Sequence, residues 1–405
     1  MSLLTLAPGA MANDAPLQIF EGVNYQATSS TLEAYTVYSG DAIPNGLNKK
    51  TSSLILKKGY QVCIATKEKG QGLSKMLIAV NRDIRIPKLS AQFNDVITFL
   101  RVTPSRNVAK RGHCGNPDPR FNAAWFYTWG GTKESTENLL WTPMIFPKKK
   151  AGEWTTDLVK RTDIQEVIGF NEPDSPEGWR VVKPDYAVRL LQNALSVGIR
   201  MGSPSPRESG PRKWLPEFME AAKAQNLRVD FLCLHWYDRQ AARKAKNRND
   251  SGEEVFDRFK TYMTTVYEKY GLPIWLTEFN ANPSRNNTVQ RKFLELAMAW
   301  MDTTPWMERY AYFQPIPIPG ESYREDIALD LKKNVGELTK HEIKMRHPGT
   351  GDFTIKAHFD SERPLTELGK YWSNYKAAPY LSKDVYLGKN NLCEDEVEET
   401  MEPAQ

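Results

Sequence analysis

Cysteine is scarce in this sequence, with four residues among 405, at Cys63, Cys114, Cys233 and Cys393. No two of them form a CxxC pair, and their spacing fits neither a zinc site nor the disulfide framework of a small secreted domain. If Cys114 and Cys233 meet inside a folded domain, we expect two buried free thiols. No His, Asp and Glu residues cluster at metal-ligand spacing, so we expect chemistry without a metal or other cofactor.

Long apolar runs and a strong charge of either sign are also missing. No run approaches the ~20 apolar residues of a membrane-spanning helix, and the net charge is only +5. We therefore expect neither a membrane nor nucleic acid as the main partner. Residues 1–16 are expected to form a flexible N-terminal segment. Residues 10–12 resemble a signal-cleavage site, but a basic n-region is missing and Pro8 and Gly9 interrupt the apolar core.

Residues 17–103 carry short alternating apolar runs separated by Gly, Asn and Asp, without a sustained helical period. The expected strands include Leu17–Phe20, Ser53–Leu56, Gln61–Ile64 and Val96–Leu100. The segment Leu47–Leu54 recurs in altered form as Phe93–Leu100. The pattern predicts a small all-β domain built from two similar four-strand units.

This domain resembles the βγ-crystallin fold of two Greek keys. Residues 20–27 resemble its aromatic corner, with Ala27 where the family usually has glycine, and residues 66–72 keep the glycine but lack the aromatics. Loops that bind calcium in that family correspond here to the candidate ligands Asn48, Asn94 and Asp95. Lys49, however, places a cation at the second ligand position of the first loop. We therefore favour a purely structural role for the two Greek keys.

From residue 108 onward, strand and helix patterns alternate. The expected strands are Lys110–Cys114, Trp125–Trp129, Leu139–Phe146, Glu166–Asn171, Arg200–Pro204, Phe231–Tyr237, Pro273–Phe279 and Arg309–Gln314. The expected helices are Pro184–Val197, Ser251–Tyr270, Thr288–Met301 and Leu365–Tyr375. The sequence therefore predicts an α/β fold, a (β/α)8 TIM barrel over residues 108–380, with short early connections and the small all-β domain before it.

Two further segments of this half do not fit the alternation. Residues 315–363 form a charged, Gly- and Pro-rich insertion that either walls the cleft or is a surface excursion. Residues 381–405 form an acidic C-terminal tail.

Two carboxylates are predicted at the ends of buried strands on one face of the barrel. Glu172 follows the fourth strand, and Glu278 ends the seventh. Cleavage of a glycosidic bond needs one carboxylic acid to protonate the leaving oxygen and a second carboxylate to attack the anomeric carbon or activate water. A single glutamate is usually a surface or ion-paired residue, but two at this edge favour the catalytic interpretation.

Longer motifs around these glutamates resemble glycoside hydrolase family 128, the β-1,3-glucanases of the retaining barrel clan. They are Gly169–Asp174 (GFNEPD) and Pro273–Phe279 (PIWLTEF), accompanied in order by 110–112, 125–130, 143–144, 202–204, 234–237 and 365–369. The resemblance implies that Glu172 is the acid/base, Glu278 the nucleophile and Asn171 a ligand of the sugar 2-hydroxyl. As an acid at neutral pH, Glu172 is then expected to have a raised pKa.

Aromatic side chains near strand ends are the expected sugar subsites, although each is as readily a core residue. They are Tyr127, Trp129, Trp141, Trp236 and Tyr237, of which we favour Tyr127 and Trp129 beside Gly130 and Gly131. His235 shares a strand face with Tyr237, which could donate a hydrogen bond to Glu278, and a satisfied core histidine is the alternative for His235. The basic segment 239–248 is interpreted as a solvated face.

We expect a monomeric, endo-acting enzyme whose partner is β-1,3-glucan or its oligosaccharides, secreted or at the cell surface because of that substrate. A β-1,4-glycanase or mannanase on the same fold is one alternative. A non-hydrolytic glucan-binding or cell-wall protein is the other. The β domain is a further candidate for glucan binding.

Overall fold

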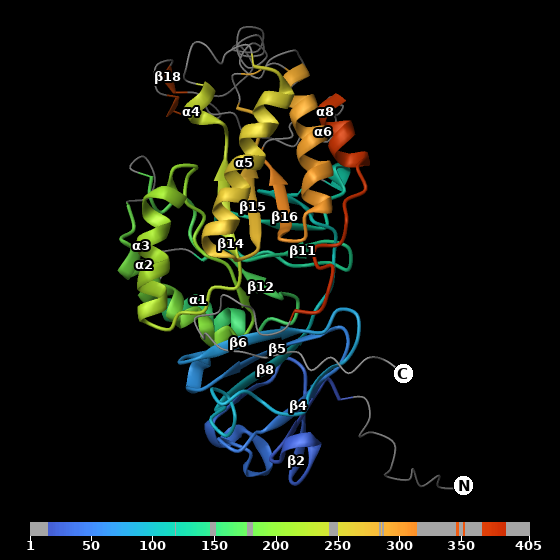
Figure 1. Cartoon of the computed structure of the whole chain (residues 1–405), viewed down its shortest axis with the longest axis vertical. Coiled ribbons are helices and arrows are strands. Elements are labelled where there is room, and N and C mark those ends of the chain that lie inside the picture. Colours follow the sequence, from blue (N-terminus) through green and yellow to red (C-terminus); the bar gives the residue numbers. More distant parts are fainter. Residues whose placement is uncertain are drawn as a thin grey trace, which may run out of the picture.

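The computed structural model describes residues 15–117, 119–145, 151–175, 181–242, 250–282, 285, 287–313, 346–347, 351–352 and 367–385. The predicted N-terminal segment and C-terminal tail lie almost wholly outside these residues, as do Cys393 and nearly all of the predicted insertion. In the described part, an antiparallel β domain lies below a mixed α/β domain (Figure 1). No helix that the structure describes is long and apolar enough to span a membrane.

The β domain consists of two four-stranded antiparallel sheets. The first sheet contains, in spatial order, β2 (Ser29–Leu32), β1 (Leu17–Phe20), β4 (Ser53–Leu56) and β7 (Ile84–Ile86). The second contains β3 (Val37–Ser39), β8 (Phe99–Pro104), β5 (Tyr60–Ala65) and β6 (Ser74–Ile78). The third strand of each half, β3 or β7, therefore pairs into the sheet of the other half. The strand expected at Val96–Leu100 begins later, at Phe99, because the residues before it form the loop that carries the sequence repeat.

The two copies of that repeat bond to each other reciprocally. Lys49 N–H donates to Ile97 O (2.9 Å), and Asp95 N–H donates to Thr51 O (3.0 Å). Lys49 (φ 56°) and Asp95 (φ 58°) also share the left-handed conformation. The sequence repeat thus corresponds to a structural repeat. Apolar side chains from both sheets pack together in the core of this domain.

Within the residues that the structure describes, the α/β domain contains eight short parallel strands. They are β9 (Arg111–Cys114), β10 (Trp125–Tyr127), β11 (Leu140–Trp141), β12 (Glu166–Val167), β13 (Arg200–Met201), β14 (Leu232–Trp236), β15 (Ile274–Phe279) and β16 (Met307–Tyr312). Six of them form a sheet in the order β11-β10-β9-β16-β15-β14, and β12 pairs with β13. Single parallel bridges, Met144 to Ile168 and Gly202 to Phe231, connect these two sets. The arrangement is barrel-like, with every strand close to its expected position.

Helices cover the outer side of these strands (Figure 1). They are α1 (Ala151–Val159), α2 (Pro184–Ala194), α3 (Trp214–Ala224), α4 (Arg239–Ala242), α5 (Gly252–Tyr270), α6 (Asn287–Thr303) and α8 (Glu367–Asn374). The predicted capping box is present at α5, where Glu254 N–H donates to Ser251 Oγ and Ser251 N–H donates to the Glu254 carboxylate. As expected from the short early gaps, only a 3-10 turn, Pro119–Phe121, lies in the described residues between β9 and β10.

The second sheet of the β domain packs against the lower end of the α/β domain. The Arg101 guanidinium on β8 donates to the carbonyls of Val197, Val159 and Arg161, and Gln61 donates to Gln165 O (2.8 Å). One core cluster contains Ile78 of β6 together with the side chains inside the barrel-like sheet. The two domains therefore share buried structure. Cys114 and Cys233 belong to the same cluster as free buried thiols, as the sequence predicts.

Candidate active site

Glu172 lies just beyond β12, in a sharp turn. Its N–H donates to Ser205 O (2.9 Å) in the loop after β13. Its φ is +38°, in the left-handed region that glycine prefers, so the chain holds this side chain at the cost of local strain. Pro173 follows and prevents further strand pairing. The backbone thus turns sharply where the carboxylate has to project over the end of the sheet.

Glu278 is re-aimed by a bulge in β15. The pairing of β14 with β15 shifts register between Leu234 and His235, so that Thr277 is an extra residue and His235 lies opposite Glu278. A bulge of one residue turns the following side chain to the other face of a strand. Thr277 Oγ1 donates within the sheet interior to Leu234 O (3.1 Å), and Glu278 still faces the site.

Both oxygens of Glu278 accept hydrogen bonds. Tyr127 Oη (3.3 Å) and Trp129 Nε1 (3.2 Å) donate to Oε1, and Tyr237 Oη (2.5 Å) donates to Oε2. The side chain is only 7% exposed. Burial, followed by the charge of Glu278, raises the pKa of both tyrosines, so they stay protonated and keep donating. The expected contact of Tyr237 with Glu278 is present.

His235 connects the two carboxylates. Its Nδ1 lies 3.2 Å from Glu172 Oε1 and 3.5 Å from Glu278 Oε2, and its side chain is fully buried. One atom from each of the three residues can be chosen so that all lie within 4.8 Å of one another. Three strand ends therefore bring an acid, an imidazole and a second acid into direct contact.

The expected rise in the pKa of Glu172 is wrong. Burial raises the pKa, but the hydrogen bond and charge of His235, followed by the charges of Arg239 and Arg207, outweigh it and lower the pKa. For His235, burial lowers the pKa, but the charge of Glu278 and the hydrogen bond and charge of Glu172 raise it above its ordinary value. The sequence offered His235 as a site residue or a core histidine, but it did not show that the imidazole lies between the two carboxylates.

Two of the expected sugar-stacking residues are core side chains instead. Trp236 is buried against Phe259 and Phe293, between the sheet and the helices. Alternation along β14 explains this, since His235 and Tyr237 face the site and the residue between them faces the opposite side. Trp141 is buried in the same outer core, with the Arg161 guanidinium over its ring (5.2 Å).

A phenylalanine that we did not predict completes the aromatic wall of the site. Phe313, directly after β16, makes edge contacts with the rings of Trp129 (centroids 6.1 Å apart) and Tyr237 (5.8 Å). Its position at the end of the eighth strand was the one available signal. Trp129 presents its indole N–H to Glu278, so it is a hydrogen-bond donor as well as an aromatic surface.

The structure also shows the contacts of Asn171, Asp174 and Arg239, which lie in the loops around the site. Asn171 pairs with the strand end at Ser205, and its Oδ1 is buried without a partner among the described residues. Asp174 accepts from Arg207 N–H (2.9 Å), so it connects the loop after β12 with the loop after β13. The Arg239 guanidinium lies over the Tyr237 ring (5.4 Å). Arg239, the first residue of the basic segment 239–248, is exposed, and the other basic residues of that segment lie outside the described residues.

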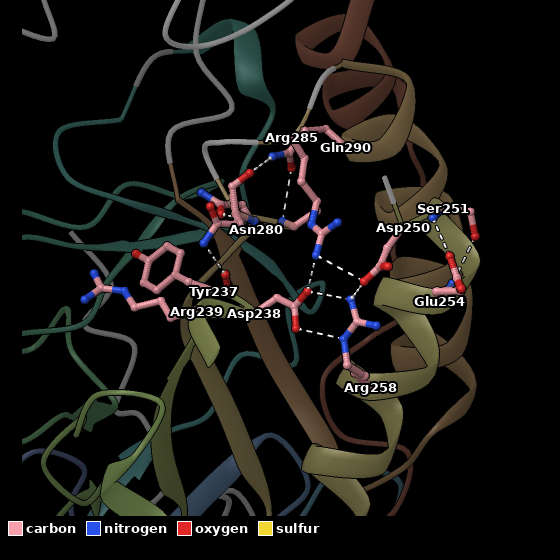
Figure 2. Close-up of polar contacts among 12 residues, drawn as sticks. Tyr237, Asp238, Arg239, Asp250, Ser251, Glu254, Arg258, Asn280, Arg285 and Gln290 are labelled. Carbon is pink, nitrogen blue, oxygen red and sulfur yellow. Dashed lines mark hydrogen bonds and ion pairs between the residues drawn. The ribbon is translucent and has the colours of Figure 1, made fainter. Parts of the chain in front are cut away.

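An ion-pair network fixes the backbone that carries Tyr237 (Figure 2). Asp238 accepts from Arg258 Nη2 and Arg285 Nη2, both at 2.7 Å, and Asp250 extends the cluster. Asp238 itself has a left-handed φ of 50°. The charges thus clamp the strained residue next to Tyr237 to α5 and to the loop after β15.

Glu172, His235 and Glu278 also have atoms close enough to contact one ion. The sequence spacing did not indicate such a cluster, because its members come from three different strands. Since these atoms already bond to one another or to Tyr237, we treat them as an acid/base group.

The calcium candidates in the β domain bond to protein groups. Asn48 Oδ1 accepts from Thr98 Oγ1 (2.7 Å), and Asp95 accepts from Ser52 Oγ (2.9 Å) and from Asn94 Nδ2 (2.7 Å).

Among the solved structures that are similar to the chain are several glycoside hydrolase family 128 enzymes. An endo-β-1,3-glucanase of Amycolatopsis mediterranei, in complex with laminaritriose, is 27% identical and covers 51% of this chain and 88% of that one (TM-score 0.42). A curdlan-specific exo-β-1,3-glucanase of Blastomyces gilchristii is 26% identical (50% and 89%, TM-score 0.40). An endo-β-1,3-glucanase of Pseudomonas viridiflava is 19% identical (66% and 98%, TM-score 0.45).

A curated relative and a protein family also match. Alkali-sensitive linkage protein 1 of Schizosaccharomyces pombe is 26% identical over 205 residues, which are 47% of this chain. The match spans about a third of that relative's length (34%). The family described as "Glycosyl hydrolase catalytic core" matches residues 113–341. This match covers more than half of the chain and includes Glu172, His235 and Glu278, so the protein belongs to the glycosyl hydrolase catalytic core family and is a glycoside hydrolase.

Proposed function

We propose that the protein cleaves β-1,3-glucan with retention of configuration, with Glu172 as acid/base and Glu278 as nucleophile. The observation that carries this proposal is the contact of both carboxylates with one imidazole nitrogen, and oxygen atoms of the two lie within 4.8 Å of each other. Retaining enzymes have carboxyl groups about 5–5.5 Å apart, whereas inverting enzymes need roughly 6.5–9.5 Å to admit a water molecule.

In the first step, Glu278 attacks the anomeric carbon while Glu172 gives its proton to the leaving oxygen. The donors Tyr127, Trp129 and Tyr237 hold Glu278 in one orientation, so little side-chain freedom is lost on attack. In the second step, Glu172 takes a proton from water, which attacks the glycosyl-enzyme. The unpartnered Oδ1 of Asn171 is the acceptor for the sugar 2-hydroxyl.

The β-1,3 linkage is supported by the motifs around both glutamates, which resemble those of glycoside hydrolase family 128. Endo action, a monomeric state and a location outside the cell or at its surface are parts of the same proposal, the last because the substrate is a polymer. Trp129, Tyr127, Tyr237 and Phe313 supply aromatic surface beside Glu278.

We further propose a closed (β/α)8 barrel over residues 108–380 and a βγ-crystallin-like pair of Greek keys over 17–103. Parallel pairing of β16 with β9 supports the first. The exchange of β3 and β7 between the two sheets supports the second.

The test is hydrolysis of laminarin by the native protein, Glu172→Gln and Glu278→Gln. Both variants should lose at least about 10³-fold in kcat while unfolding at the same temperature as the native protein. NMR of the first product should show the β-anomer. Near-native activity in either variant, or an α-anomer, would refute the assignment. Faster release of sugar from cellulose or mannan would point to a β-1,4-glycanase, and tight laminarin binding without product would indicate a binding protein.

A further inference from the structure

The first chemical step requires a proton on Glu172, and the nearest donor to that carboxylate is His235. The Nδ1–Oε1 distance of 3.2 Å is a direct hydrogen bond. His235 Nε2 is buried and has no partner among the described residues. Since the side chain is fully buried and Glu172 is 23% exposed, Nδ1 is the atom through which the imidazole exchanges its proton, and Glu172 is the nearest exit.

Charged and titratable groups surround His235 on several sides. Glu172 and Asp174 approach from the loop after β12, and Glu278 approaches from β15. Tyr237 lies on its own strand and Tyr127 on β10, both bonded to Glu278. The charges of Arg239 and Arg207 act on Glu172 as well. The imidazole therefore faces carboxylates, and the nearby cations face the carboxylate that has to become an acid.

We propose that His235 stores the catalytic proton in the free enzyme and passes it to Glu172 when the glucan binds. This inference rests on the proposed function. The N–H bond of the imidazolium breaks and an O–H bond forms on Glu172, so the pair changes from two opposite charges to two neutral groups. Glu278 stays ionised, the cluster keeps one proton and the same net charge, and no proton from solvent is needed.

Substrate binding supplies the reason for transfer. A sugar seated on Glu172 removes the water that stabilises its charged form, and burying an ion pair is less favourable than burying the two neutral groups unless further hydrogen bonds compensate. In the free enzyme the lowered pKa of Glu172 and the raised pKa of His235 both favour the proton on the imidazole. His235 is thus a positioning residue for the proton that acts through Glu172.

The first test uses the dependence on the leaving group. His235→Gln should lower kcat/KM on laminarin about 10–100-fold, because a general acid contributes roughly 10²–10⁴-fold and part of this depends on its protonation. On dinitrophenyl β-laminaribioside, whose leaving group needs no proton, the loss should stay below about 3-fold. His113→Gln is the matched control, because it removes another buried histidine of the same sheet, on β9. It should lower kcat/KM equally on both substrates or on neither. Equal losses on both substrates for His235→Gln would overturn the proposal.

The second test is the pH profile of kcat/KM on laminarin. In the native enzyme the alkaline limb reports loss of the shared proton, so it should lie above the ordinary histidine pKa of about 6.5. In His235→Gln the proton is held by a carboxyl group alone, and the limb should move down by about one to two pH units. An unchanged limb would count against proton storage.

A third measurement does not depend on activity. The imidazole signal of His235, assigned by its loss in His235→Gln, should titrate at lower pH in Glu172→Gln than in the native protein, since the variant removes a negative charge at 3.2 Å. An unchanged titration would refute the coupling. If the titration of His235 depends on Glu172 but laminarin is not cleaved, the proposed substrate is wrong, whereas the proton shared by His235 and Glu172 is supported.

Discussion

Glu278 is held on both oxygens, and the shortest of its contacts is with the Tyr237 hydroxyl, 2.5 Å from Oε2. Hydrogen bonds to a charged group contribute about 1.5–3 kcal/mol, more than bonds between neutral groups. In the proposed mechanism this carboxylate has to point at the anomeric carbon, so this donor should affect the geometry of attack more than substrate binding.

Tyr237→Phe should therefore lower kcat on laminarin about 10–100-fold, with little change in KM. This factor is the free energy of that hydrogen bond converted at about 1.4 kcal/mol per factor of ten. Steady-state kinetics measures both parameters. Tyr312→Phe is the matched control, because it removes a buried hydroxyl that donates to Gln290 (2.7 Å) instead of to Glu278. A raised KM with unchanged kcat in Tyr237→Phe would show that the hydroxyl serves binding.

Ala27 is a second residue with a conformation that matters, far from the site. Its φ is 63°, and Gly72, at the corresponding place in the second half of the β domain, has φ 72°. A side chain in the left-handed region costs about 1–2 kcal/mol relative to the right-handed one.

Ala27→Gly should raise the free energy of unfolding by about 0.5–1 kcal/mol, since relief of strain exceeds the extra freedom of glycine in the unfolded chain. Urea denaturation followed by tryptophan fluorescence measures the change. The reverse substitution, Gly72→Ala, should destabilise, because its Cβ would lie 2.6 Å from Thr66 Oγ1. A loss of stability in Ala27→Gly would contradict the strain argument.

At the scale of elements, the bulge in β15 is what allows consecutive residues to serve different purposes. Thr277 Oγ1 donates to Leu234 O (3.1 Å) and lies 3.1 Å from the Ser205 hydroxyl, inside the sheet. Without the extra residue, the alternation of a regular strand would point Glu278 toward the helices. The threonine hydroxyl therefore holds the register that points Glu278 into the site.

Thr277→Val keeps the shape of the side chain but leaves Leu234 O without that donor. We expect a loss of about 1–3 kcal/mol in the free energy of unfolding and a fall in kcat on laminarin at temperatures where the protein is still folded. Thr277→Ser, which keeps the hydroxyl, should restore most of the activity. Full activity in Thr277→Val would show that the strand holds its register without this bond.

At the scale of the whole molecule, the junction between the two domains includes one position, Gly70, that admits no side chain. Gly70, in the β domain, has φ 70°, and a Cβ there would lie 2.3 Å from the Leu195 carbonyl oxygen at the end of α2. Arg101 reaches across the same junction. The close approach of backbone to backbone requires glycine here.

Gly70→Ala should lower the free energy of unfolding by about 2–4 kcal/mol, from left-handed strain plus the clash between domains. Gly46→Ala is the matched control, because Gly46 has φ 68° but nothing lies within 4 Å of the position that its Cβ would occupy, so only the strain remains. Chemical denaturation of both variants gives the comparison. Equal losses would mean that the junction yields to an added methyl group.

Sequence patterns predicted the succession of strands along the chain and the positions of both glutamates at strand ends, because each strand ends in a visible change of composition, such as Asn171 to Pro173. They did not predict the bulge at Thr277, which depends on pairing with a strand far away in sequence. Distances between strand ends are likewise absent from the sequence, so His235 remained a choice between a core residue and a ligand. Strict alternation along β14 would have excluded Trp236 from the expected sugar-binding residues, because it places this side chain on the opposite face from His235 and Tyr237.

The shared core at the junction bears on how such enzymes are recombined. Ile78 contributes to the interior of the barrel-like sheet, and the Arg228 guanidinium contacts Cys63 Sγ (2.9 Å) across the same boundary. A fragment starting near residue 105 would expose this apolar surface and would leave the Arg228 guanidinium without its contacts in the β domain. If the α/β domain were transferred to another protein by gene fusion, the β domain would therefore have to be transferred with it.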